Sequence, residues 1–486
     1  MKNATANWAR ETSVDTLVTL FESLVARTGG TFRDREQAAL ELANELVRRW
    51  CENDLTRLAN GYGDEVRVDG NTYRRHARGT RRYHTLCGSI DVPRDTFRLV
   101  GKHNGPTIVP LELETGIVEN ATPALAFSVT QGFAERPLRH YEAEMSAAHR
   151  RVPSRSTLER IGKRVGERIR AALPLVETIV RASERIPDAA HSISVGLDRT
   201  TVPMAEPAER SRCRTRPYVR RPPEPVTVAF RMAYVATLAI HDEDGETLRS
   251  TRLASTAGEG PDELLRRLGA EVRHVLSQRP NLMLTVVQDG APELWKLVDH
   301  WLERERFTTA AKLIDRFHVD ERLAQICLAV THRVEVARDL YQAWHTQLNR
   351  SDGAIDRICR RLNELSDAYL GQVDGDPMPR FWESRAKYRL SGEAATTAWT
   401  NLAYLDRHRK YLRYASARRR GLPIGSGVTE GACKSVITMR FKRCGQRWFE
   451  EGLSPCLQLR ALHLNERLRP CFDLLLTSRK ASLAVA

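Results

Sequence analysis

Hydrophobic residues follow helical spacing in some stretches of the chain and alternate with polar residues in others. Over residues 13–60 they recur every three or four positions, which predicts two successive helices. Over residues 64–100 they alternate with polar residues and glycines interrupt the pattern, so short antiparallel strands are expected. Over residues 122–185 the spacing is helical again. A proline breaks this stretch, and Ser156 with Glu159 has the spacing of a capping box.

Residues 190–320 contain a different order of elements. Three strand patterns come first, and helix, strand, helix and strand follow. The strand patterns cover residues 193–197, 226–240, 247–253, 282–287 and 312–314. The first three are joined tightly enough to be antiparallel, whereas the last two follow helices and should join the sheet in parallel. This is the element order of an RNase H-like fold, so we expect an α/β multi-domain protein with such a core.

The changes of pattern also predict where the chain divides. The expected parts are N-terminal helices with a small antiparallel β module (1–120), a helical region like a helix-turn-helix (121–185), the first part of the RNase H-like core (190–320), an α-helical insertion (321–415), the second part of the core (416–470) and a C-terminal tail (471–486).

Composition narrows the class of protein. Lys and Arg number 76 against 61 Asp and Glu, a net charge of +15, and 41% of the residues are hydrophobic. A sizeable core is therefore expected, with a surface that favours a polyanionic partner, of which nucleic acid is the commonest. Residues 1–11 lack the apolar stretch of a secretory signal, no stretch resembles a membrane span, and the nine cysteines include no CxxC pair. These features favour a reducing cytoplasm, without a disulfide scaffold or a zinc ribbon.

Basic residues gather in several places where DNA could bind. The sets are Arg160, Lys163 and Arg164 on the second helix of the 121–185 region, Arg418 and Arg419 within a basic run at 407–420, Lys434, Arg440 and Lys442 after a glycine-rich segment, and Arg199 at the start of an arginine-rich loop expected over 199–225. Two interpretations of the helix at 155–169 fit its sequence equally well: a helix that recognises DNA, or an ordinary surface helix. Lys434, four residues after Glu430, could pair with that glutamate or meet a phosphate.

Three acids stand at positions that suit chemistry. Asp198 and Asp289 each close a predicted core strand, and Glu430 begins a helix. Carboxylates that converge at the ends of neighbouring strands suit Mg²⁺ or Mn²⁺, and two such ions can act on a phosphodiester. Spacing alone leaves Glu430 open between ligand and helix cap. Asp315 and His318 follow the last strand. Asp315 is either an auxiliary acid or the cap of the next helix, and His318 either contacts substrate or packs as a structural side chain.

Four segments carry a resemblance to a known family. They are GLDRTTVPM at 196–204, QDG at 288–290, LIDRFHV at 313–319 and PIGSGVTEGACK at 423–434. These segments resemble DDE transposases of bacterial insertion sequences, and in particular the ISKra-type family. The resemblance covers most of residues 80–470.

The resemblance implies an RNase H-like catalytic domain with a helical insertion, and two divalent metal ions held by Asp198, Asp289 and Glu430. It implies hydrolysis at the ends of the element and attack of the freed 3′-hydroxyls on target DNA. The implied partners are double-stranded DNA, as terminal inverted repeats and target, and further copies of the chain in a homo-oligomer. Relatives often have paired cysteines after the 85–98 strands. Because this chain lacks them, no zinc is expected.

Two other functions fit parts of the same pattern. An RNase H-like DNA nuclease would use the same acids but would not join strands. A DNA-binding regulator derived from a transposase would keep the basic surface without chemistry, and loss of one acid would be expected in it. A protein-interaction scaffold without DNA conflicts with the net charge of +15.

Overall fold

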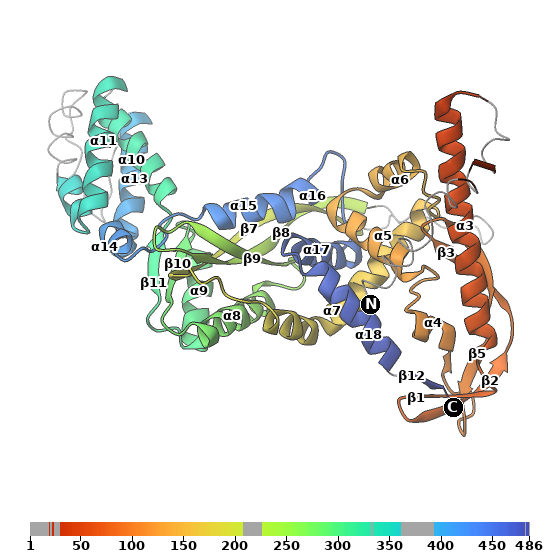
Figure 1. The fold of residues 1–486 in the computed structure, drawn as a ribbon. Coiled ribbons are helices and arrows are strands. Elements are labelled where there is room, and N and C mark those ends of the chain that lie inside the picture. The colour runs from red at the N-terminus through yellow and green to blue at the C-terminus, as the bar shows by residue number, and fades with distance from the viewer. Residues whose placement is uncertain are drawn as a thin grey trace, which may run out of the picture. The chain divides into compact units, whose positions relative to one another are not determined.

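The structure is a computed structural model. It describes residues 19, 22–23, 30–207, 226–331, 334–360, 393–481 and 483–485 of the 486 in the chain. They form a mixed α/β structure with several sheets, which confirms the α/β class (Figure 1). The chain divides into two compact units, one of Met1–Glu177 with Glu466–Ala486 and one of Thr178–Asn465.

The first unit combines helices with antiparallel strands. Its elements are α3 (Phe32–Asn60), β1 (Glu65–Val68), β2 (Asn71–Ala77), β3 (Thr80–Thr85), β4 (Gly88–Pro93), β5 (Thr96–Leu99), β6 (Thr107–Ile108), α4 (Pro110–Thr115), α5 (Pro123–Glu135), α6 (Leu138–Ala147), most of α7 (Arg155–Ala182), α18 (Leu468–Ala481) and β12 (Leu483–Val485). The strands form a sheet of order β12-β1-β2-β5-β6 and a separate β3-β4 hairpin. The antiparallel strands expected over 64–100 are therefore present.

Helix α3 is a single helix of 29 residues that begins with a capping box between Thr31 and Asp34. The helix expected before it falls almost wholly outside the described residues. Several hydrophobic side chains on which the helical pattern rested are exposed in α3, among them Leu40 and Val47 at 44% and 48%. Periodicity thus predicted the helix correctly but did not identify its buried face.

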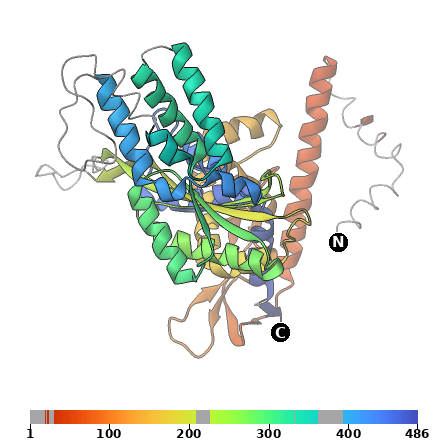
Figure 2. The ribbon, with the colours of Figure 1, turned by 90° about the vertical axis from the view of Figure 1, so that its left-hand side faces the viewer.

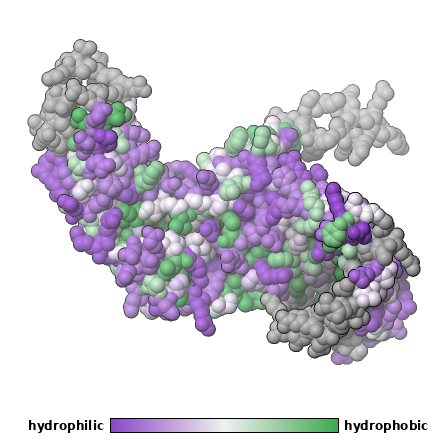
Figure 3. Space-filling model, turned by 45° about the horizontal axis from the view of Figure 1, so that its top comes forward, coloured by the Kyte–Doolittle hydropathy of each residue, from purple (hydrophilic) through white to green (hydrophobic). Residues whose placement is uncertain are grey.

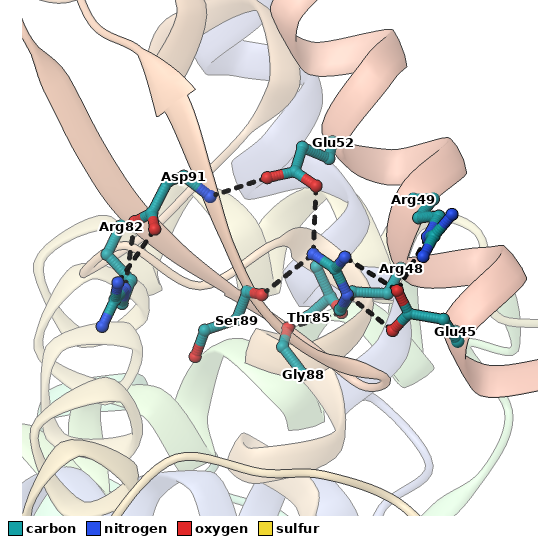
Figure 4. Close-up of polar contacts among 9 residues, drawn as sticks. All are labelled: Glu45, Arg48, Arg49, Glu52, Arg82, Thr85, Gly88, Ser89 and Asp91. Atoms are coloured by element: carbon teal, nitrogen blue, oxygen red, sulfur yellow. Dashed lines mark hydrogen bonds and ion pairs between the residues drawn. The ribbon is translucent and has the colours of Figure 1, made fainter. Parts of the chain in front are cut away.

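Arg48 ties α3 to the β3-β4 hairpin (Figure 4). Its guanidinium pairs with Glu45 and Glu52 on α3 and donates to the Ser89 carbonyl oxygen at 3.4 Å. Glu52 in turn accepts a hydrogen bond from the Asp91 N–H at 3.2 Å. These polar contacts supplement a small hydrophobic core in which Leu55, Tyr83 and Ile90 are buried.

The C-terminal residues, expected only as a tail, are ordered elements of the first unit. Helix α18 ends shortly before β12, and β12 pairs antiparallel with β1, with Val66 opposite Val485. Residues distant in sequence therefore complete one sheet, which no local pattern could reveal.

Helix α7 has the hydrophobic face that the sequence predicts. The residues on this face, Leu158, Ile161, Val165 and Ile169, are all buried. The helix begins at Arg155, so Ser156 lies inside its first turn. The expected capping box of Ser156 and Glu159 is therefore wrong, because a cap must precede the first helical residue.

The second unit contains a five-stranded sheet and its covering helices. Its elements are β7 (Ser192–Pro207), β8 (Val226–His241), β9 (Thr247–Ser255), α8 (Pro261–Gln278), β10 (Met283–Gln288), α9 (Pro292–Glu305), β11 (Ala311–Ile314), α10 (Arg316–Thr331), α11 (Val334–Arg350), α13 (Glu393–Arg407), η1 (Arg409–Tyr411), α14 (Tyr414–Arg419), α15 (Gly427–Ala432), the π-helical turn η2 (Cys433–Thr438), α16 (Met439–Phe441) and α17 (Glu450–Leu464).

The strand order in this sheet is β11-β10-β7-β8-β9. Strands β7, β8 and β9 are antiparallel neighbours, whereas β10 is parallel to β7 and β11 is parallel to β10. These are the strand directions that the element order predicts. Helices α8 and α9 cover one face of the sheet and α15 lies on the other (Figure 1).

Helices α10, α11 and α13 lie side by side next to the sheet (Figures 1 and 2). They fall in the region expected as a helical insertion, although α10 begins slightly earlier. Residues 361–392 of that region lie outside the described residues. Buried side chains such as Trp344 and Leu402 continue the hydrophobic core of the sheet into these helices.

Strand β7 is longer than the sequence predicts. The expected strand stops at Asp198, but β7 continues to Pro207 as an antiparallel ribbon with β8, with Asp198 opposite Val235. The expected loop over 199–225 is therefore wrong for residues 199–207, and residues 208–225 lie outside the described residues. Among the described residues, pairing of β7 with β10 ends at Val195, whereas the extension pairs with β8 along its whole length and is bridged to Trp448 at Met204.

Among the described helices, none is both long enough and apolar enough to cross a membrane. In Figure 3 hydrophilic residues cover most of the visible face, and hydrophobic residues gather there only in small patches.

Candidate active site

The acids singled out in the sequence come together in one cavity of the second unit. The cavity has a volume of about 190 Å³ and is lined by Leu197, Asp198, Gln288, Asp289, His318, Ser426, Thr429 and Glu430. The four titratable side chains come from β7, from the residue after β10, from α10 and from α15. Residues separated by up to 233 positions thus line the same small space.

Asp198 lies on β7 just beyond the segment that pairs with β10. Its Oδ1 accepts a hydrogen bond from the Arg199 N–H at 2.7 Å. On its other side lies the thiol of Cys433, whose pKa is raised by burial and by the charge of Asp198. The neutral thiol is a hydrogen-bond donor to the carboxylate, so Asp198 is held by a backbone N–H and by a thiol.

Asp289 is fixed through both its side chain and its backbone. Its Oδ1 accepts from the Ala291 N–H at 3.0 Å, and its carbonyl oxygen accepts from Trp295 Nε1 at 2.8 Å. The Trp295 ring stacks on Tyr411 with centroids 4.5 Å apart. Burial raises the pKa of Asp289, and the charge of Asp198 raises it further.

Glu430 reaches the cavity because α15 packs directly against β7. A Cβ atom added at Gly196 would lie 2.2 Å from Thr429 Oγ1, so only glycine permits this approach. Thr429 Oγ1 is also 2.7 Å from Thr237 Oγ1 on β8. Glu430 Oε1 accepts from Ser426 Oγ at 2.9 Å, and its side chain is 49% exposed.

Asp315 and His318 form a hydrogen-bonded pair at the edge of the cavity. Asp315 caps α10 by accepting from the His318 N–H at 3.2 Å, and it accepts from His318 Nδ1 at 2.6 Å. Its other oxygen accepts from the Ser426 N–H at 2.7 Å, just before α15. Burial opposes ionisation, but these hydrogen bonds outweigh it and lower the pKa of Asp315. The contact with Asp315 raises the pKa of His318.

Asp315 therefore caps α10, as one of the two alternatives expected, and His318 lies beside the acids of the cavity. His318 Nδ1 also lies 3.7 Å from Glu430 Oε1. Asp315, His318 and Glu430 each offer a ligand atom, and these atoms lie within 4.8 Å of one another, so this group could hold a metal ion.

Carboxylates line the cavity, but in the described part of the chain the ligand atoms that lie within 4.8 Å of one another are those of Asp315, His318 and Glu430. Asp198, Asp289 and Glu430 offer carboxylate oxygens, the ligands preferred by Mg²⁺ and Mn²⁺. The raised pKa of Asp289 reflects burial and repulsion by Asp198, both of which a cation between the two side chains would relieve.

The basic residues near the cavity have different surroundings. Lys442 donates from Nζ to Thr200 Oγ1, two residues after Asp198. Arg199 forms an ion pair with Glu293, at the start of α9, so its charge is already matched. Lys434 is exposed on η2, and no ion pair between Lys434 and Glu430 is found in the described part of the chain.

Arg440 is buried, with 1% of its surface exposed. Its guanidinium lies over the rings of Phe441 and Trp448, 5.4 and 4.9 Å from their centroids. The expectation that Arg440 contacts DNA is therefore wrong. Its place in the sequence, between exposed basic residues, did not distinguish it from them.

The basic residues of α7 are largely matched by acids. Arg160 and Arg164 lie 3.4 and 3.7 Å from Glu119, and Lys163 pairs with Glu159 at 2.7 Å. These pairs weaken the case for α7 as a DNA-reading helix. Arg418 and Arg419, by contrast, are exposed at the end of α14.

Sequence reasoning missed two residues that support the acids. Gln288 accepts a hydrogen bond from the Leu197 N–H at 3.0 Å through its Oε1, which joins β10 to β7 beside both aspartates. Trp295 holds the backbone of Asp289. Gln288 could have been noticed as the neighbour of Asp289, but nothing in the sequence signals the hydrogen bond of Trp295.

A scan of the chain against protein-family models found no match, and neither did a search of curated proteins.

Proposed function

We propose that this protein is a metal-dependent DDE transposase, which cleaves DNA at the ends of an insertion sequence and joins those ends to target DNA. The observation that carries the proposal is the meeting of Asp198, Asp289 and Glu430 in one cavity. These acids come from three separate segments, each of which resembles the corresponding transposase motif.

The strand order supports the proposal independently of the acids. The sheet has the spatial order β9-β8-β7-β10-β11, with three antiparallel strands followed by two parallel ones. This is the arrangement expected of an RNase H-like core. The acids lie beyond the carboxyl end of β10 and beyond the part of β7 that pairs with it, where sites of open α/β sheets are found.

In this proposal Asp198, Asp289 and Glu430 hold Mg²⁺ or Mn²⁺, as two ions. Such ions, when bound, would activate the attacking oxygen and stabilise the leaving oxygen of the phosphodiester. Asp315 accepts a hydrogen bond from the Nδ1–H of His318, so the other ring nitrogen points away from Asp315. His318 lines the cavity, where it can hydrogen-bond to an oxygen of the scissile phosphate.

The substrate in this proposal is double-stranded DNA, bound as terminal inverted repeats and as target by a homo-oligomer of the chain. The net charge of +15 supports a polyanionic substrate. Lys442 contacts Thr200, two residues after Asp198, and Lys434 is exposed four residues after Glu430. The exposed Arg418 and Arg419 offer a second contact for phosphates.

The test is cleavage and joining of a plasmid that carries the DNA flanking the coding sequence. Wild-type protein with Mg²⁺ is expected to yield joined product, and EDTA is expected to abolish it. Asp198→Asn, Asp289→Asn and Glu430→Gln should each abolish cleavage while DNA binding persists. Asp244→Asn, in the exposed turn before β9, is the matched control and should cleave normally.

The other outcomes distinguish the alternatives. Cleavage without joining, also from pre-cleaved ends, would mean an RNase H-like nuclease. Specific binding without cleavage in either metal would mean a regulator derived from a transposase. A triad variant that cleaves at the wild-type rate would remove that residue from the site.

A further inference from the structure

The ribbon formed by β7 and β8 carries a hydrophobic stripe on its surface. Val228, Phe230 and Met232 alternate along β8 and so share one face, with exposed fractions of 48%, 68% and 39%. Large side chains gathered on an exposed face typically mark a binding surface.

Three basic residues, Lys442, Arg443 and Arg447, lie beside this stripe, and we call them the basic wall. A cavity of about 510 Å³ is lined by Thr201, Pro203, Val228, Phe230, Lys442, Arg443, Gly445, Gln446 and Arg447. Three of these residues are cationic and none is acidic. Gln446 also lines the cavity, and its Oε1 is shielded from solvent and accepts no hydrogen bond from the described residues.

The wall is held firmly against the ribbon. The Trp448 N–H donates to the Pro203 carbonyl oxygen at 3.0 Å, and the Ala205 N–H donates to the Trp448 carbonyl oxygen at 2.8 Å. The Trp448 ring packs on Phe441 with centroids 5.0 Å apart. The cavity is therefore part of the folded structure and does not depend on a free loop.

One side chain links this cavity to the strand that carries Asp198. Lys442 lines the cavity and also contacts Thr200, which stands two positions from Asp198 on β7. A strand whose phosphate lay at the acids would place its neighbouring nucleotide near the basic wall.

We propose that this cavity binds an unpaired nucleotide of the DNA strand that enters the acid site. Phe230 stacks on the base, Lys442, Arg443 and Arg447 contact the flanking phosphates, and Gln446 faces the base edge. The inference rests on the proposed function, because it names the form in which that site takes its DNA. Charge complementarity selects a nucleic acid over an apolar peptide as the occupant.

Binding is measured in EDTA, so that no cleavage occurs, with two duplexes of the same sequence. One is blunt and the other has a three-nucleotide single-stranded tail that carries 2-aminopurine. Wild-type protein should bind the tailed duplex more tightly and quench the 2-aminopurine. Phe230→Leu keeps an apolar side chain but loses the aromatic face. It should lose the preference for the tail by roughly 5- to 150-fold, the affinity equivalent of stacking one base.

Phe230→Trp should restore both the preference and the quenching. Phe32→Leu, which changes an equally exposed phenylalanine on α3, is the matched control and should behave as wild type. Equal binding of tailed and blunt duplexes, or an unchanged preference in Phe230→Leu, would overturn the inference and leave the proposed transposase intact. Absence of DNA binding at any salt concentration would overturn both.

Discussion

At the scale of single residues, the absence of one side chain sets the position of Glu430, an acid of the candidate site. Gly196 lets α15 approach β7 so closely that Thr429 fills the space of a Cβ atom. Glu430, the next residue, is thereby held over the strand that carries Asp198. The local sequence around Gly196 predicts a strand but not this contact, because the contact is made by a residue more than 200 positions away.

We expect Gly196→Ala to push α15 away from β7. The overpacking should cost about 1–3 kcal/mol of the free energy of unfolding and should abolish DNA cleavage. Gly431→Ala is the matched control, because an added Cβ there meets nothing within 4 Å. Chemical denaturation and the cleavage assay measure the two effects. Wild-type cleavage by Gly196→Ala would show that the close approach is not needed.

Asp315 is hydrogen-bonded to His318, which lines the cavity. We expect Asp315→Asn to lower the cleavage rate by about 10- to 100-fold with little change in DNA affinity, because the variant no longer orients His318. His318→Gln should have a similar effect. In the double variant the two losses should not add, since both remove the same oriented imidazole. Additive losses would indicate that Asp315 acts independently, through its bond to Ser426.

At the scale of elements, buried polar contacts join strands that turns alone would leave loosely connected. His241, at the end of β8, is 2% exposed. Its Nδ1 donates to the Gly245 carbonyl oxygen at 3.1 Å, and its Nε2 accepts from Ser194 Oγ at 2.8 Å. The neutral ring therefore links β7, β8 and the turn that leads to β9. The sequence predicted that turn from its Asp and Gly residues but not the histidine beneath it.

This contact predicts a loss of stability in acid. Burial lowers the pKa of His241 in the folded protein. As the pH falls below the ordinary histidine value of 6.5, the unfolded chain takes up a proton first, so stability declines until the lowered pKa is reached. The contribution to the slope is at most about 1.4 kcal/mol per pH unit.

His241→Asn should remove this contribution. The variant should be less stable at pH 7 by about 0.5–1.5 kcal/mol for each hydrogen bond that it no longer forms, and its unfolding free energy should depend less on pH below 6.5. Denaturation curves of both proteins at several pH values measure the difference. Parallel pH profiles would show that His241 does not titrate differently on folding.

At the scale of the whole molecule, the excess of positive charge matters only where acids do not cancel it. The net charge is +15, yet the basic residues of α7 lie beside Glu119, Glu159 and Glu167. Arg418 and Arg419 are exposed on α14. A count of charges from the sequence could not separate these two sets, because the pairs form only in the folded protein.

We expect the double change Arg418→Gln and Arg419→Gln to weaken DNA binding. The slope of log affinity against log salt concentration should become shallower by about 0.9 for each DNA phosphate that the variant no longer neutralises. Arg266→Gln is the matched control, because Arg266 is an exposed residue that pairs with Glu263 on α8. Fluorescence anisotropy over a range of salt concentrations measures the slope. An unchanged slope would exclude these arginines from the DNA interface.

The sequence by itself determined the α/β class, the directions of the strands of the central sheet and the three acids of the candidate site. Hydrophobic periodicity and loop length express local preferences, and acids next to strands could be selected by position alone. Only the tertiary structure decided that Arg440 is buried, that β7 continues past Asp198, that β12 completes a distant sheet and that His318 is held by Asp315. These features depend on contacts between residues far apart in the chain, and local sequence patterns do not encode such contacts.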